Sequence, residues 1–251
     1  MDLELAGKRA IVTGGSRGIG KAIACELAAE GADVGIAARD EQRIADAVAE
    51  LTELTGQRIV GVSCDTREDV SVRAMVATLA ESLGGVEILV NAAAMPGGFA
   101  PPPRLADVTA DALWAEVNTK VMGYLRCARE AAPFMITNGW GRIINISGLA
   151  ARQTGSIFGS IRNVAVSAMT KNLADELGPH GINVTVVHPG ATRTERTPPE
   201  LAARPTGNAI ERMVEAHEVA YVVAFLASPK SIGITGDAIA CGGGARGAIH
   251  Y

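Results

Sequence analysis

The sequence has no long apolar run, no cluster of basic residues and few cysteines. Its late apolar run, Tyr221–Ala227, is far too short to span a bilayer. Because the net charge is −4 and no basic stripe occurs, nucleic acid is not expected as a partner. The opening residues, Met1–Glu4, are acidic and lack the basic and apolar regions of a signal peptide, so we expect a cytoplasmic protein.

The four cysteines are too widely spaced to form a metal-binding pattern, and no metal site is predicted. We expect them to be reduced thiols that fill small spaces in the core. They are Cys25, Cys64, Cys127 and Cys241. The remaining composition, 48% hydrophobic and 20% charged, is ordinary for a soluble globular protein. A length of 251 residues suits one α/β domain, so we predict that residues 1–251 form a single domain.

A glycine-rich loop follows the first apolar run of the chain. Residues Thr13–Gly20 lie between Ala10–Val12 and a helical pattern. Glycines let the backbone turn sharply and approach a ligand closely, and the helix that follows offers unpaired N–H groups to an anion. The loop therefore predicts a site for the pyrophosphate of a dinucleotide. The residues predicted to bind it are Gly14, Ser16, Arg17, Gly18, Ile19 and Gly20.

Strand and helix patterns alternate almost to the end of the chain, with short connections between them. This alternation predicts a doubly wound, Rossmann-type α/β fold with a seven-stranded parallel sheet, and it shows no domain boundary and no repeat. The predicted strands are Ala10–Val12, Val34–Ala38, Ile59–Val62, Val86–Val90, Ile143–Ile146, Val184–Val187 and Ala238–Ala240.

Two long helices and two loops complete the prediction. Helices are expected over Asp111–Met135 and Phe158–Leu177. Both are apolar beyond one core stripe, which predicts that they pair subunits in a homo-tetramer or dimer. The stretch Met95–Pro103 is rich in Pro and Gly and is predicted to be a loop. The polar stretch Thr192–Asn208 holds three prolines and is predicted to be a mobile loop that shapes the substrate pocket.

Four further motifs follow predicted strands or lie in the first long helix. With the glycine-rich loop, this set resembles the classical short-chain dehydrogenase/reductase family, and the resemblance runs from Gly7 to about Gly244. The motifs are Asp65 after the third strand, Asn91–Ala94 after the fourth, Trp114-x-x-x-Asn118 in the helix, and Pro189–Thr194 after the sixth strand.

The resemblance implies a role for each of these residues. Asp65 resembles the aspartate that contacts the adenine of the cofactor, and Thr194 matches the threonine that often contacts the nicotinamide amide. Pro189 and Gly190 belong to the same cofactor-binding segment. Asn91 matches the first residue of the family's Asn-Asn-Ala-Gly, whose second Asn and final Gly are alanines here.

The end of the second strand favours NADP(H) over NAD(H). An NAD enzyme of this type usually places an acid there to bind the ribose 2′-hydroxyl, whereas this chain has Ala38. Arg39 follows, and Arg17 lies in the glycine-rich loop. Two guanidinium groups suit a 2′-phosphate, which accepts forked hydrogen bonds. The alternative is that Arg39 is a solvated charge offset by Asp40 and Glu41.

The catalytic positions depart from the family. Its working set is an Asn in the first long helix, a Ser after the fifth strand, and Tyr-x-x-x-Lys in the next helix, where the Tyr exchanges a proton with the substrate oxygen. Asn118 matches the Asn, and Ser147 lies one residue before Gly148, where the Ser is expected. Gly159 and Asn163 stand in place of the Tyr and the Lys.

Three functions remain open at this point. The first is a carbonyl/alcohol oxidoreductase with an atypical active site, acting on a small molecule of unknown class. The second is a catalytically inactive dinucleotide-binding sensor or scaffold subunit, and the third is a non-redox, cofactor-assisted enzyme. For the first, the candidate groups are Asn118, Ser147, Arg162 and Asn163, with Ser160, His188 and the terminal Tyr251 as weaker alternatives.

Overall fold

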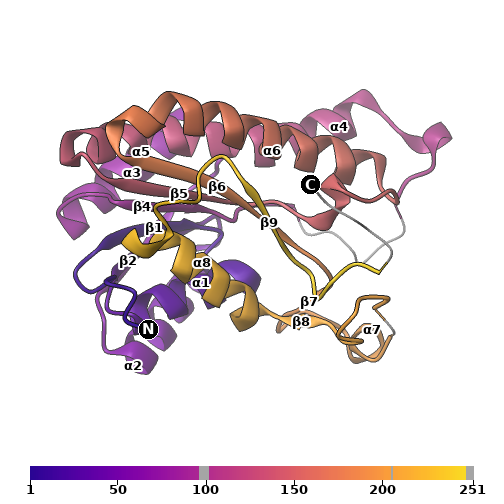
Figure 1. Ribbon diagram of the computed structural model, residues 1–251, viewed down its shortest axis with the longest axis horizontal. Helices are drawn as coiled ribbons and strands as arrows, with labels where there is room; N and C mark the ends of the chain where they lie inside the picture. Colours follow the sequence, from indigo (N-terminus) through magenta and orange to yellow (C-terminus); the bar gives the residue numbers. More distant parts are fainter. Residues whose placement is uncertain (96–101, 205, 247–251) are drawn as a thin grey trace.

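A parallel β-sheet forms the middle layer of the protein (Figure 1). The computed structural model describes residues 1–95, 102–204 and 206–246, and within them the sheet has seven strands in the order β3-β2-β1-β4-β5-β6-β9. Every neighbouring pair is parallel. The strands are β1 (Arg9–Thr13), β2 (Asp33–Ala38), β3 (Ile59–Ser63), β4 (Ile88–Asn91), β5 (Gly141–Ile146), β6 (Ile182–Pro189) and β9 (Ala238–Cys241).

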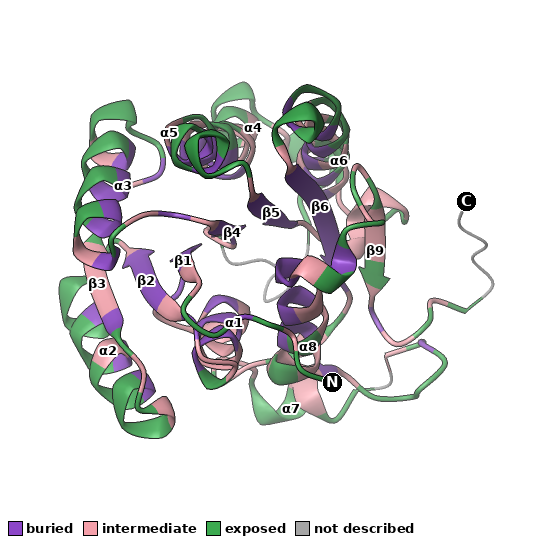
Figure 2. Ribbon diagram, turned by 60° about the vertical axis from the view of Figure 1, so that its left-hand side comes forward, coloured by how far each residue is buried: buried purple, intermediate pink, exposed green. Residues whose placement is uncertain are grey.

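Helices cover both faces of the sheet, as Figure 2 shows. One apolar core lies between the sheet and α1, α2 and α8, and a second lies between the sheet and α3, α5 and α6. None of the helices in the described part of the chain is long and apolar enough to cross a membrane. Their bounds are α1 (Gly18–Ala29), α2 (Glu41–Thr55), α3 (Asp69–Leu83), α4 (Ala110–Val117), α5 (Gly123–Asn138), α6 (Ile157–Leu177) and α8 (Ala216–Ala227).

The predicted doubly wound parallel sheet is confirmed. Strands covered on both faces read as nearly continuous apolar runs, and β4 and β6 are buried along their whole length. Prediction and structure differ at the ends of strands. The fourth strand was expected over Val86–Val90 and begins two residues later, whereas the sixth extends beyond Val184–Val187 at both ends.

The first long helix is not one regular helix. Instead of a single helix over Asp111–Met135, α4 runs into a π-helical turn over Asn118–Met122, and α5 follows it. The helix begins where Thr109 Oγ1 accepts a hydrogen bond from the N–H of Ala112. A π turn adds a residue to the helical repeat and so changes which side chains after it face the sheet.

The stretch Thr192–Asn208 has more regular structure than predicted. It contains the two-residue strand β7 (Thr192–Arg193), which pairs in parallel with β8 (Val214–Glu215), and the single turn α7 (Pro199–Ala202). Pro205 in this stretch, residues 96–101 of the other predicted loop, and Tyr251 lie outside the described residues.

A chain of buried polar side chains ties the centre of the sheet to α6. Asn91 Nδ2 donates to Asn145 Oδ1, and Asn145 Nδ2 donates to Thr170 Oγ1, both at 3.0 Å. All three residues are fully buried. Because a buried polar group without a partner is costly, these bonds fix β4, β5 and α6 relative to one another.

Asn145→Ala is therefore expected to lower the free energy of unfolding by about 2–4 kcal/mol, since it leaves two buried polar groups without their partner. Urea unfolding followed by circular dichroism measures the change. Asn172→Ala is the matched control, because Asn172 is exposed on α6 and donates only to a carbonyl of its own helix. Equal stability of the two variants would show that the network is dispensable.

Candidate functional site

A cleft of about 1730 Å³ opens along the carboxyl edge of the sheet. Its walls come from the segments that follow β1 to β6, together with the first turns of α6 and residues of α4 and the π turn after it. Ligands of doubly wound sheets bind at this edge, where neighbouring connections leave to opposite faces. The cleft therefore lies where the glycine-rich loop predicts it.

The glycine-rich loop has no room for side chains at two of its positions. A Cβ on Gly20 would lie 2.3 Å from the carbonyl oxygen of Gly14, and one on Gly14 would lie 2.9 Å from the backbone of Ala92. The N–H of Gly18, at the start of α1, donates to Glu195 Oε1 at 2.9 Å. A carboxylate oxygen thus occupies the place of an anion at a helix N-terminus, and the cradle fits a pyrophosphate.

Arginines line the end of the cleft where the family resemblance predicts that the adenine half of the cofactor binds. Arg17, Arg39, Arg43 and Arg196 all line it. Burial lowers the pKa of Arg17, and the like charges of Arg196 and Arg43 lower it further. Asp40 pairs with Arg43 at 3.2 Å. Glu195 opposes the lowering of the pKa of Arg17. Arg17 and Arg39 both line the cleft, where two guanidinium groups could bind an anionic group of a ligand.

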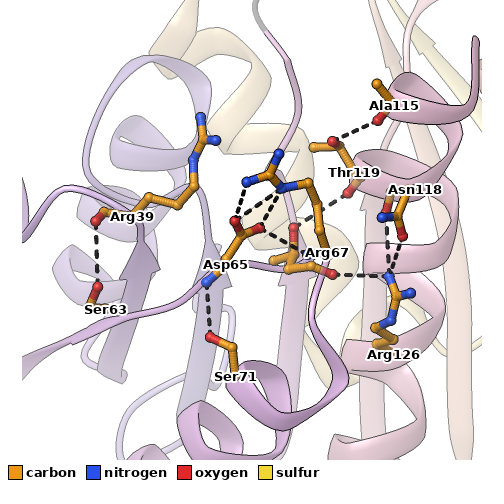
Figure 3. A network of polar contacts seen from close by, with 10 residues as sticks. Arg39, Ser63, Asp65, Arg67, Ser71, Ala115, Asn118, Thr119 and Arg126 are labelled. Carbon is orange, nitrogen blue, oxygen red and sulfur yellow. Dashed lines mark hydrogen bonds and ion pairs between the residues drawn. The ribbon is translucent and has the colours of Figure 1, made fainter. Parts of the chain in front are cut away.

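Asp65 lies in the cleft wall but is held by its neighbour Arg67 (Figure 3). The Nε of Arg67 donates to both carboxylate oxygens, at 2.9 and 3.0 Å. These hydrogen bonds hold the pKa of Asp65 below its ordinary value. The carboxylate therefore stays charged and is held by Arg67, and the charge of Arg39 also lowers its pKa.

Most of the predicted cofactor residues line the cleft, and one does not. Asn91 is fully buried behind it, where its amide donates to Asn145. Asn91 therefore supports the sheet behind the cleft, and its part in cofactor binding stays a prediction. The predicted residues that do line the cleft are Gly14, Ser16, Arg17, Gly18, Ile19, Gly20, Arg39, Asp65, Pro189, Gly190 and Thr194.

Asn118 is not part of the cleft wall. Its Oδ1 accepts a hydrogen bond from Arg126 Nη1 at 2.9 Å, and Figure 3 shows this pair directed toward the segment after β3. The expected place of Asn118 beside Ser147 and Asn163 is thus not observed. The π turn that begins at this residue determines which way the side chains of the segment face.

The other three predicted catalytic residues do meet at the far end of the cleft. Ser147, Arg162 and Asn163 all line it, next to Gly148 and Gly159. Ser147 Oγ donates to the carbonyl of Asn163 at 3.2 Å. The Nδ2 of Asn163 lies 3.0 Å from the position that a Cβ on Gly148 would take, so the amide occupies space that glycine leaves free.

Gly159 leaves a gap in the first turn of α6. That turn begins after Ser156, whose Oγ accepts a hydrogen bond from the N–H of Gly159 at 3.0 Å. A Cβ on Gly159 would lie 3.0 Å from the same Oγ. This contact is tight, but it involves a side-chain atom rather than the backbone. No side chain from this position reaches the cleft, which therefore lacks the phenol that the family pattern places there.

Lys120 is a member of this group that sequence reasoning missed. It is 3% exposed, and its Nζ donates to Asn163 Oδ1 and to the carbonyl of Ser147, both at 3.0 Å. Burial lowers the pKa of Lys120 to about 7, and the charge of Arg162 acts in the same direction. No local pattern in the sequence marked Lys120, because its burial depends on acceptors that Ser147 and Asn163 provide.

Two of the weaker candidates, Ser160 and His188, are not part of the cleft wall. Ser160 Oγ donates to the carbonyl of Gln153 at 3.3 Å. His188 is buried, with Nδ1 accepting from the N–H of Gly148 at 3.4 Å and Nε2 3.3 Å from Ser167 Oγ. Arg162 lines the cleft but its Nη1 pairs with Glu116, which lines the cleft too.

A doubly wound sheet with a glycine-rich anion cradle, beside a cluster of polar groups, defines a dinucleotide-binding protein of the oxidoreductase type. Residues 14–246 match a family model described as enoyl-(acyl carrier protein) reductase. A short-chain reductase protein, NovJ of Streptomyces niveus, is 36% identical over 94% of this chain and 92% of its own. The chain belongs to the short-chain dehydrogenase/reductase family.

Solved structures agree with this assignment. A short-chain dehydrogenase of Burkholderia cenocepacia in complex with NADP superposes with a TM-score of 0.84 at 37% identity, over 96% of this chain and 98% of that one. The L-sorbose reductase of Gluconobacter frateurii, complexed with NADPH and L-sorbose, gives a TM-score of 0.89 at 28% identity, over 99% of this chain and 100% of that one.

Proposed function

We propose that this protein binds NADP(H) and interconverts a carbonyl compound and an alcohol, with an active site in which Gly159 and Asn163 replace the usual Tyr and Lys. The observation that carries the proposal is the continuity of the cleft. One cavity runs from Arg17 and Arg39 to Ser147 and Asn163, so it has room for a dinucleotide and for a small substrate beside it.

The arginine cluster supports NADP(H) as the cofactor. Arg39 follows the neutral Ala38 at the end of β2. The charge of Arg39 contributes to the lowered pKa of Arg17, so the two guanidinium groups lie near each other. A 2′-phosphate would neutralise part of this excess through charge-assisted hydrogen bonds. The Burkholderia and Gluconobacter proteins were solved with NADP and NADPH, which favours the same cofactor here.

The residues at the far end of the cleft would bind and orient the carbonyl oxygen. When bound, NADPH supplies a hydride to the carbonyl carbon. The amide of Asn163 would donate a hydrogen bond to the carbonyl oxygen as negative charge develops on it. Since no phenol projects from position 159, the oxygen takes its proton from water, and the product is an alcohol.

Binding without turnover is a second candidate function, favoured by the side chain missing at Gly159. Such a sensor or scaffold subunit would bind NADPH and consume none in the presence of any carbonyl. A product formed without change in the redox state of the cofactor would instead indicate the third, non-redox reading. Absorbance of NADPH and product analysis by mass spectrometry separate the three.

The protein is expected to bind NADPH more tightly than NADH. Arg39→Ala should weaken NADPH binding by about 10–100-fold, the loss of one charge-assisted contact, and leave NADH binding unchanged. Calorimetric titration of both cofactors measures this. Arg73→Ala, an exposed arginine on α3, is the control. Equal affinities of the native protein for NADPH and NADH would refute the assignment.

Carbonyl reduction by the native protein is expected to be slow, about 10²–10⁴-fold below the median enzyme turnover of about 10 s⁻¹, because a positioned proton donor is missing. Installing Gly159→Tyr and Asn163→Lys should raise the rate only when Lys120→Met is added, since two ammonium groups would otherwise face each other. Assays with NADPH and a panel of aldehydes and ketones test this. Native turnover near the median would contradict it.

We also propose that the protein is a homo-tetramer or dimer paired through α4, α5 and α6. Large apolar side chains are exposed on these helices and on the π turn between α4 and α5, and an extra apolar face needs a partner. They are Trp114, Met122, Leu125, Phe134, Ile136, Ile157, Ile161 and Val164.

Light scattering at micromolar concentration should therefore give the mass of two or four chains. Ile161→Asp combined with Val164→Asp should shift the mass toward one chain, because it places charges in the apolar face. Ile232→Asp is the control, since Ile232 is 63% exposed in the turn after α8. A monomeric native protein would rule out the assembly.

A further inference from the structure

We propose that Lys120 provides the positive charge of the carbonyl-binding site and orients the amide of Asn163 so that its NH₂ group faces the substrate oxygen. In this role Lys120 is a positioning residue and Asn163 is the group that touches substrate. The inference rests on the proposed function, which it deepens by assigning the source of the charge.

The contact between Lys120 and Asn163 fixes the orientation of the amide. An ammonium group can only donate hydrogen bonds, so the Asn163 atom 3.0 Å from Lys120 Nζ must be the carbonyl oxygen. The NH₂ group therefore points to the other side, toward Gly148, which has no side chain of its own beside it. Because Asn163 and Gly148 both line the cleft, a ligand oxygen placed there meets an amide donor.

The charges around this amide favour negative charge on the ligand. Two cations, Lys120 and Arg162, share one nearby carboxylate, Glu116, and that carboxylate is paired with Arg162. Within the described residues, no carboxylate forms an ion pair with Lys120. A buried cation without a counterion is costly, and the cost falls as the substrate oxygen gains negative charge during hydride transfer. The site is thus built to stabilise an oxyanion through Asn163.

The protonation state of Lys120 makes the inference testable by pH. Its pKa is lowered to about 7 by burial and by Arg162 from α6, against the opposing charge of Glu116 from α4. The other titratable groups around it are Tyr124, whose Oη donates to the carbonyl of Ile146, and His188, which contacts Gly148 from β6. As pH rises through about 7 the ammonium is lost, so carbonyl reduction should fall on the alkaline side.

Three variants and a pH series test the role of Lys120 in the full-length protein. Lys120→Met should lower kcat for the fastest carbonyl of the panel by about 100-fold, as for loss of one oxyanion-stabilising group, while NADPH affinity is unchanged. Lys120→Arg should keep part of the rate and lose the alkaline decline, because a guanidinium stays charged at all these pH values. Asn163→Leu should lower kcat as Lys120→Met does, and the two losses should not add. Lys171→Met, an exposed lysine on α6, is the control.

The outcomes separate this inference from the proposed function. If the native protein binds NADPH and consumes none with any carbonyl, the proposed function fails and this inference with it. If the native protein is active and Lys120→Met is as fast, or Lys120→Arg retains the alkaline decline, this inference alone fails. If Lys120→Met does not fold, the inference is tested by the pH profile of the native protein and by the kcat of Asn163→Leu. A native rate of carbonyl reduction that is flat across about pH 6–9 overturns it.

Discussion

The pairing of β1 with β4 is the constraint on which the cleft depends. Thr13 stands opposite Asn91 in this pair, so the loops that leave the two strands must pass each other closely. Thr13 Oγ1 accepts hydrogen bonds from the N–H groups of Ala92 and Ala93, at 3.1 and 3.3 Å. The chain runs to β2 on one side and to β5 on the other, which opens a crevice between the two loops.

The same close passage limits the residues that this crevice accepts. Gly14 has positive φ and lies against the backbone of Ala92, so a side chain at this position would push β1 and β4 apart. Behind the crevice, Asn145 joins β4 to α6, and α6 carries Asn163. The cofactor cradle and the carbonyl end of the cleft are thus held by one continuous set of buried contacts.

The sequence was sufficient to predict the parallel sheet and the position of the glycine-rich loop at the end of its first strand, whereas the replacement of the usual Tyr and Lys stays a prediction. Buried parallel strands are short apolar runs, and a glycine pattern at a strand end has few other uses, so both signals are local. The directions in which the side chains of Asn118 and Lys120 point could not be predicted in this way. Two residues apart on a helix, they point in nearly opposite directions, and the π turn that decides between them leaves no local pattern in the sequence.

Burial of Lys120 could not be predicted either, because it depends on contacts between α6 and the end of β5. A lysine in a helix is exposed in most proteins, and only the packed structure shows that Ser147 and Asn163 provide acceptors for it. Two cationic side chains therefore line this end of the cleft, Lys120 from the π turn and Arg162 from α6. Cationic side chains line both ends of the cleft, partly exposed arginines at one end and the buried Lys120 at the other.

The fit of Asn163 over Gly148 has a consequence for how such a site can change over generations. A serine at 148 would crowd the amide of Asn163, and a lysine at 163 would meet the ammonium of Lys120, so each single replacement toward the usual family residues is opposed by another residue already in place. Coupled neighbours of this kind change in a preferred order or together. Lineages that acquired this arrangement are therefore expected to retain it as a unit, and the joint occurrence of Lys120, Gly148 and Asn163 would mark them as a group within the family.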